Sequence, residues 1–162
     1  LSFTAEEAWK IFAHNTNSKD TIFTEEFHVL PSIKDGAALI TKWQRIREMR
    51  SDITKAIEHE REAGHVGSSL QAEIHIQASS SDAALLKSLG EDLKFITITS
   101  SATVEEKSDI SEIVVSVKSS AHQKCGRCWH YRDDVGHDPQ HPDLCGRCTT
   151  NLFGSGEERQ VA

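Results

Sequence analysis

One four-residue motif occurs twice and constrains this chain more than any other feature. Cys-Gly-Arg-Cys stands at 125–128 and again at 145–148, and these are the four cysteines of the chain. Two residues between paired cysteines let one tight turn direct both sulfurs to the same point, and two such turns supply a tetrahedron of thiolates. The spacing therefore predicts one structural Zn²⁺ ion, closed to catalytic water and held by Cys125, Cys128, Cys145 and Cys148.

Three other uses of paired cysteines fit less well. Covalent haem attachment requires a histidine directly after the second cysteine, where Trp129 and Thr149 stand. A thioredoxin-like site has one such pair beside a βαβ unit, and a two-disulfide module suits a secreted protein, whereas no signal peptide is visible here. A histidine could replace one cysteine ligand, although the symmetry of the two motifs favours four cysteines; the candidates are His122, His130, His137 and His141.

The bulk properties narrow the class of protein. A net charge of −7 over 162 residues argues against a protein that coats nucleic acid, but it leaves room for a local basic patch. No apolar run approaches the length of about 18 residues that a transmembrane helix needs. We therefore expect no membrane span and a cytoplasmic location. Because the chain begins at Leu1, inside an apparent helix start, we expect it to be the C-terminal piece of a longer protein.

The hydrophobic pattern predicts an α+β fold in three parts. Residues 1–36 are typical of the C-terminal edge of a helical domain, residues 37–119 of an α/β domain, and residues 120–162 of a zinc module that folds only with its metal. The middle part should form a small mixed sheet with one long and one short helix on one face. The predicted elements are a helix over 37–63, a strand over 70–78, a helix over 83–89 and strands over 95–99 and 113–117, with polar loops over 14–20 and between the last two strands.

Basic residues gather at one place in the predicted long helix. Lys42, Arg45, Arg47 and Arg50 stand against a single acid, Glu48. In one interpretation they solvate an exposed helix, with Arg50 reaching outward from the edge of the core. In the other they form a basic face that lies against phosphates.

A second group of cations surrounds the cysteine motifs. Lys124, Arg127 and Arg147 either offset the negative charge of a zinc ion with four thiolates or contact RNA. Trp129 is either part of the small core of the zinc module or a platform on which a base stacks, a role that His130 or Tyr131 could share.

Around the cysteines the chain reads Lys-Cys-Gly-Arg-Cys-Trp-His-Tyr over 124–131 and Leu-Cys-Gly-Arg-Cys over 144–148. This segment resembles the C-terminal zinc finger of the bacterial isoleucyl-tRNA synthetases. Gly126 stands where that family often has proline, which leaves the turn possible. Weaker similarity to the same family covers the rest of the chain, in Phe-Thr-Ala-Glu-Glu-Ala-Trp over 3–9, in the segments beginning at Trp43 and Gly67, and in the closing residues 154–162.

The resemblance implies a parent enzyme that joins isoleucine to tRNA(Ile) with ATP. It implies that ATP and isoleucine bind in a catalytic domain outside this chain, that an editing domain belongs to the same polypeptide, and that the enzyme is a monomer. This region itself should catalyse nothing and should grip the anticodon arm of the tRNA, so that the acceptor end reaches the active site. The hypothetical tRNA contacts are Lys42, Arg45, Arg47, Arg50, Lys124, Arg127, Trp129, His130 and Arg147.

Two alternatives remain on the sequence alone. DNA glycosylases of the formamidopyrimidine type end in a similar four-cysteine finger, although they need a helix–two-turns–helix segment where this chain has an alternating strand. A zinc ribbon that binds only other proteins is the third possibility.

Overall fold

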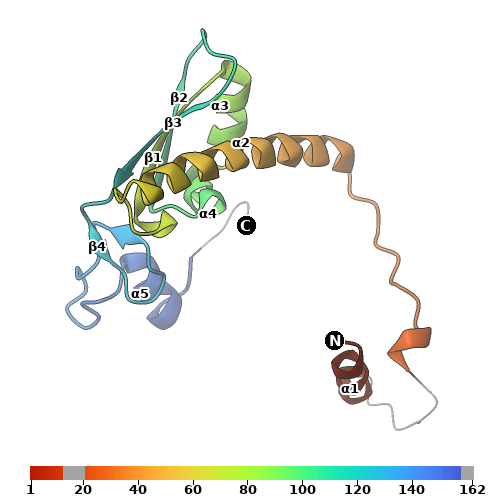
Figure 1. The fold of residues 1–162 in the computed structure, drawn as a ribbon. Coiled ribbons are helices and arrows are strands. Elements are labelled where there is room, and N and C mark those ends of the chain that lie inside the picture. Colours follow the sequence, from red (N-terminus) through yellow and green to blue (C-terminus); the bar gives the residue numbers. More distant parts are fainter. Residues whose placement is uncertain (13–20, 158–162) are drawn as a thin grey trace. The chain divides into compact units, whose positions relative to one another are not determined.

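A computed structural model describes residues 1–12 and 21–157 (Figure 1). The predicted loop over 14–20 and the last residues of the family-like closing segment, 158–162, lie outside the described residues. The chain divides into two compact units, Leu1–Gly36 and Ala37–Ala162, and each is considered by itself.

The first unit contains helix α1 (Ser2–Phe12) and a short 3₁₀ turn, η1 (Ile22–Thr24). Glu6 links them, because its Oε2 accepts hydrogen bonds from the Thr21 hydroxyl at 2.7 Å and from the Ile22 N–H at 3.0 Å. Helix α1 buries no residue, and Ile11 and Phe12 on its apolar side are exposed. The described part of this unit therefore leaves its apolar side uncovered.

Helix α2 (Gly36–Glu62) confirms the predicted long helix. Its buried residues are Ile46, Met49, Ile53 and Ile57, which recur at three- and four-residue spacing and so lie on one stripe. Leu39, in the first turn of the helix, is 46% exposed. The stripe therefore covers only the C-terminal two thirds of the helix.

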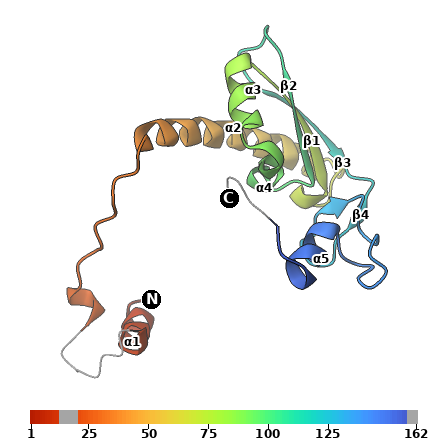
Figure 2. The same ribbon diagram turned by 180° about the vertical axis from the view of Figure 1, so that it is seen from behind.

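The sheet has the strand order β2–β1–β3. Strand β1 (Ala72–Ala78) is central, runs parallel to β2 (Ser101–Glu106) and antiparallel to β3 (Val114–Ser119), and thereby confirms the predicted mixed sheet. Alternate residues of β1 are buried, so one face packs on the core and the other carries polar side chains. Helices α2 and α3 (Ser80–Lys87) cover the buried face, as the opposite views of Figures 1 and 2 show.

The predicted strand over 95–99 is wrong, because these residues lie mostly in a helix. A 3₁₀ turn, η3 (Gly90–Asp92), leads into α4 (Leu93–Thr97), which ends at Ile98 in the left-handed conformation with φ 57°. The Thr97 hydroxyl lies 2.9 Å from the Leu93 carbonyl oxygen, to which it donates, and 2.8 Å from the Thr99 hydroxyl. These local hydrogen bonds satisfy the buried hydroxyls of Thr97 and Thr99 within the helical turn and its end.

The second sheet strand lies instead in the segment predicted as a polar loop, since β2 spans Ser101–Glu106. The zinc module follows the sheet and contains β4 (Gln123–Lys124), which pairs with β5 (Tyr131–Arg132), and helix α5 (Gly146–Phe153), which the sequence pattern did not predict. Among the described residues, no helix is both long enough and apolar enough to cross a membrane.

Candidate metal centre and nucleic-acid-binding residues

The four cysteine sulfurs converge on one point, and all lie within 4.8 Å of one another. The Sγ atoms of Cys128 and Cys145 are 3.8 Å apart. A tetrahedral zinc ion with Zn–S bonds of about 2.3 Å requires sulfur–sulfur distances of about 3.8 Å, so the donor set has the right size and chemistry. The predicted single structural zinc fits this site, and four thiolates leave no position for a catalytic water.

Each Cys-Gly-Arg-Cys motif forms a turn whose N–H groups point toward the metal site or close the turn. After the first motif, the Trp129 N–H donates to the Cys125 carbonyl at 3.0 Å, and after the second, the Thr149 N–H donates to the Cys145 carbonyl at 3.0 Å. The Cys145 N–H also donates to the Cys125 sulfur at 3.4 Å. The Gly126 N–H donates to the Asp143 carbonyl at 2.8 Å and thereby ties the first turn to the chain just before the second.

The electrostatics of the four thiols favour a bound cation. Burial raises the pKa of Cys125, but N–H donors from Cys128, Cys145 and Arg127 outweigh it and lower that pKa to about 6. Burial raises the pKa of both Cys128 and Cys145. Neighbouring thiolates repel one another in a buried site, so all four ionise together only when a metal compensates their charge.

The cations of the two motifs occupy different environments. The exposed Arg127 places its Nη1 3.7 Å from the Cys148 sulfur, where it offsets thiolate charge. Arg147 is largely buried and donates from Nε and Nη2 to the Glu157 carboxylate at 2.5 and 2.8 Å. Its guanidinium lies 4.7 Å from the centre of the Phe95 ring in α4. Arg147 therefore connects the zinc module to the α/β domain.

Trp129 is a large apolar side chain that lies exposed next to a zinc ligand. It adopts φ 66°, a conformation that costs a bulky residue about 1–2 kcal/mol, and its side chain is 58% exposed. The Lys124 ammonium lies 5.2 Å from the centre of the indole ring. Trp129 therefore contributes little to the core of the zinc module and presents an aromatic face beside a positive charge.

His130 and Tyr131 belong to the junction with the α/β domain. The His130 ring meets Phe95 edge to face, with centroids 5.4 Å apart, and its Nδ1 lies 3.2 Å from the Cys128 carbonyl. Burial lowers the pKa of His130, and the charges of Arg147, Arg132 and Lys94 lower it further. The Tyr131 N–H donates to the Ser100 hydroxyl at 2.6 Å. His130 is thus held as a neutral packing residue.

The four cations of α2 do not share one face. With 3.6 residues per turn, Arg45 lies on one flank of the buried stripe, and Arg47 and Arg50 lie on the other. Arg45 binds both carboxylate oxygens of Asp82, at 2.9 and 2.7 Å. Arg50 donates from Nε to the Ile96 carbonyl at 2.7 Å. Lys42 is half-buried and Arg47 is exposed, and Arg47 is the one of these three arginines whose side chain forms no hydrogen bond or ion pair within the described residues.

The docking contacts of the zinc module escaped the sequence interpretation. Phe95 lies in the segment predicted as a strand over 95–99, Ser100 follows that segment directly, and Glu157 lies in the closing residues, to which no structural role was assigned. No local spacing connects these residues to the cysteines, because they meet only in the folded chain.

A comparison with known protein families gives a match for the cysteine segment. Residues 123–151 match the family described as "Zinc finger found in FPG and IleRS". The fold and the tetrathiolate centre therefore define a zinc-finger region of a type that two groups of enzymes share.

Similarity over the whole chain identifies a narrower group of proteins than the zinc finger alone does. It is 54% identical over 163 residues to isoleucine–tRNA ligase from Cupriavidus necator, 54% identical over 162 residues to that of Paraburkholderia phytofirmans, and 50% identical over 168 residues to that of Bordetella pertussis. Each match covers 100% of this chain and 17% of the relative's length. The chain is thus homologous, from end to end, to one region of the isoleucine–tRNA ligases.

Proposed function

We propose that this chain is the C-terminal tRNA-binding region of an isoleucine–tRNA ligase, and that it grips the anticodon arm of tRNA(Ile). The activation of isoleucine with ATP and its transfer to tRNA take place in a catalytic domain outside these residues. Binding energy gained at the anticodon arm positions the acceptor end for that distant reaction. The parent enzyme acts as a cytoplasmic monomer, with its catalytic and editing domains on the same polypeptide.

The observation that carries this proposal is the environment of Trp129. Trp129 has a strained backbone in the turn that holds the zinc ligands, and its exposed indole beside Lys124 combines a stacking surface with a phosphate-binding charge. Unpaired bases stack on such rings in single-stranded RNA recognition, and a nearby cation neutralises the adjacent phosphate. The zinc ion fixes the conformation of this surface.

The proposed cations differ in their availability for phosphates. Arg127 and Arg47 are exposed, and they are our first candidates for phosphate contacts. Arg45 and Arg147 form intramolecular ion pairs, so we assign them a supporting role in holding the surface rather than a first contact.

Residues 1–36 have a separate role in this proposal. Helix α1 carries the exposed apolar residues Phe3, Ile11 and Phe12, which suit a helix packed against further helices of a longer chain. We propose that this segment is the edge of a helical anticodon-binding domain.

Titration of tRNA(Ile) against the full-length ligase tests the role of Trp129. Trp129→Ala removes the stacking surface and should weaken binding by about 1–3 kcal/mol, the usual value for one base on one ring. Trp129→Tyr keeps a ring in the same backbone conformation and should retain most of the affinity. Equal affinity of the alanine and wild-type proteins would exclude stacking on Trp129.

A comparison of nucleic acids separates the rivals. The same protein titrated with tRNA(Ile), with an unrelated tRNA and with duplex DNA, at several salt concentrations, should prefer tRNA(Ile) and show salt-dependent binding. Preference for duplex DNA would support a glycosylase-like finger, and binding to none of the three would support a protein-interaction module. Cys145→Ser should abolish the tRNA preference by unfolding the zinc module.

A further inference from the structure

A polar hollow of about 220 Å³ lies where the zinc module meets the sheet. The α/β domain contributes Lys94, Ser101 and Glu73 to its lining. The zinc module contributes Tyr131, Arg132 and Asp133, from β5 and the turn that follows it. The hollow is therefore composite, and it exists only while the zinc module is folded and docked on the α/β domain.

The cations of this hollow keep donors available for a ligand. Lys94 is mostly buried, and its ammonium contacts the exposed Glu91 at 2.7 Å, which uses one of its three protons. Arg132 donates from Nε and Nη2 to Asp134 at 3.0 and 3.4 Å, which leaves its Nη1 donors for a ligand. Two largely immobile positive charges therefore line one hollow.

The uncharged and acidic groups add a second kind of contact. Within residues 1–12 and 21–157, the hydroxyls of Ser101 and Tyr131 form no hydrogen bond, and the exposed Asp133 carboxylate has no ion-pair partner. A hydroxyl can donate to a phosphate oxygen, and a carboxylate can accept only from a group that carries a proton. Cations and an unpaired carboxylate side by side suit a ligand that presents both a phosphate and a hydroxyl.

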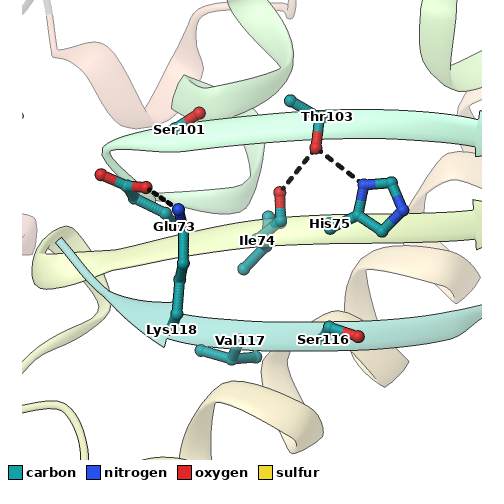
Figure 3. A pocket seen from close by; sticks show the side chains of 8 residues that line it. All are labelled: Glu73, Ile74, His75, Ser101, Thr103, Ser116, Val117 and Lys118. Atoms are coloured by element: carbon teal, nitrogen blue, oxygen red, sulfur yellow. Dashed lines mark hydrogen bonds and ion pairs between the residues drawn. The ribbon is translucent and has the colours of Figure 1, made fainter.

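The hollow continues into a groove on the outer face of the sheet. This groove, of about 330 Å³, shares Glu73 and Ser101 with the hollow and extends past Thr103 and Lys118. Figure 3 shows Lys118 of β3 reaching across β1 to Glu73, which its ammonium contacts at 2.9 Å, while Thr103 and Ser101 lie along β2. A polar track thus runs from the zinc module along the sheet.

We propose that the hollow between the zinc module and the sheet binds the ribose–phosphate backbone of RNA. Lys94 and Arg132 hold a phosphate, with the hydroxyls of Ser101 and Tyr131 as further donors. The Asp133 carboxylate accepts a hydrogen bond from a ribose 2′-hydroxyl, the group that distinguishes RNA from DNA. DNA lacks this donor, so the same carboxylate would only repel its phosphates. This inference rests on the proposed function and adds to it a second contact that recognises ribose.

Titrations of the zinc-loaded, full-length ligase test the two halves of the site separately. The probes are a tRNA(Ile) transcript and an anticodon-stem RNA hairpin made with ribose or with 2′-deoxyribose. Lys94→Gln keeps the packing of the stem but removes the charge, and it should weaken tRNA binding about tenfold and lower the slope of log K against log salt by about 1. Lys87→Gln on α3 is the matched control, because Lys87 is exposed and lines neither the hollow nor the groove; it should leave both quantities unchanged.

Asp133→Asn tests the recognition of ribose, because it removes the negative charge of the proposed acceptor. Wild-type protein should bind the ribose hairpin more tightly than the deoxyribose hairpin, and Asp133→Asn should reduce this ratio severalfold while zinc content stays at one ion per chain. An unchanged ratio in Asp133→Asn, or an unchanged salt slope in Lys94→Gln, would overturn the site although the wild type binds tRNA. If the wild type itself does not bind tRNA, the proposed function fails, which is a different result.

Discussion

Replacement of Cys128 offers the sharpest test of how zinc and packing divide the stability of this region. Cys128 is the one ligand of the four that is not fully buried, so a substituted side chain finds room there. Cys128→Ser removes a thiolate and should release the metal. Cys128→His supplies a ring nitrogen, a common zinc ligand, and should keep it.

The expected magnitude follows from the two separate cores. The buried cluster of the zinc module consists of Cys125, Val135, Cys145 and Cys148, whereas the α/β domain has its own larger cluster around Ile76. Burial of one valine stabilises a fold by about 1.5–3 kcal/mol, but zinc binding supplies about 10–16 kcal/mol to small zinc modules. Loss of the metal should therefore unfold residues 123–153 and leave the sheet folded.

Hydrogen exchange measured by mass spectrometry on the zinc-loaded, full-length ligase resolves the two regions. In Cys128→Ser, amides of 123–153 should lose protection while those of β1 and β3 keep it, and Cys128→His should resemble the wild type. Chelation of zinc from the wild type should reproduce the serine variant. Retained protection in the metal-free finger, or simultaneous loss in β1, would refute the separation of the two cores.

Three further experiments test the α/β domain and its junction with the zinc module. Ile53→Ala, in the buried stripe of α2, should lower the free energy of unfolding by about 2–5 kcal/mol. Leu39→Ala, on the exposed part of the helix, should change this free energy by less than about 1 kcal/mol. Urea denaturation of both variants measures the two values, and equal losses would contradict the observed packing of α2. Arg45 holds the pKa of the Asp82 carboxyl below its usual range, so this ion pair contributes stability above about pH 4 and loses it as the pH falls through the folded-state pKa. Asp82→Asn should therefore cost about 2 kcal/mol at pH 7 and progressively less below pH 4, and a cost independent of pH would rule out the charge as its source. Arg147→Lys loses the paired contact with Glu157 and the stacking on Phe95, and it should lower the protection of the zinc module against hydrogen exchange by about 1–2 kcal/mol without release of zinc.

Periodic segments could be predicted from the sequence, because the regular spacing of their apolar residues indicates which face is buried. The stripe of α2 and the alternation of β1 each place apolar residues on one face, and any other structure would expose them. The zinc ligands could be predicted for a similar reason, since the spacing of the cysteines is set by the geometry of the metal rather than by distant contacts.

The segment from Gly90 to Glu106 could not be predicted, because tertiary contacts override its local preference. Phe-Ile-Thr-Ile-Thr over 95–99 has the composition of a strand, yet it forms a helical turn closed by Ile98 in the left-handed conformation. The true strand β2 is rich in polar residues because it lies at the edge of the sheet, and it has a polar outer face. Its pairing with β1 is a long-range contact that leaves no local signal.

The two identical motifs of the finger show why spacing alone cannot assign roles. Both supply ligands and a turn, but the residues that follow them differ. Trp129 follows the first motif in the left-handed conformation, so the chain turns back into β5 and leaves the indole and Arg127 exposed. Helix α5 begins within the second motif and directs Arg147 onto Phe95, in the interior of the junction. The same arginine of the repeat is therefore an exposed charge beside a zinc ligand in one copy and a docking residue in the other. Exchange of the two arginines for glutamine should separate these roles: Arg127→Gln should weaken RNA binding with the fold intact, and Arg147→Gln should loosen the finger itself.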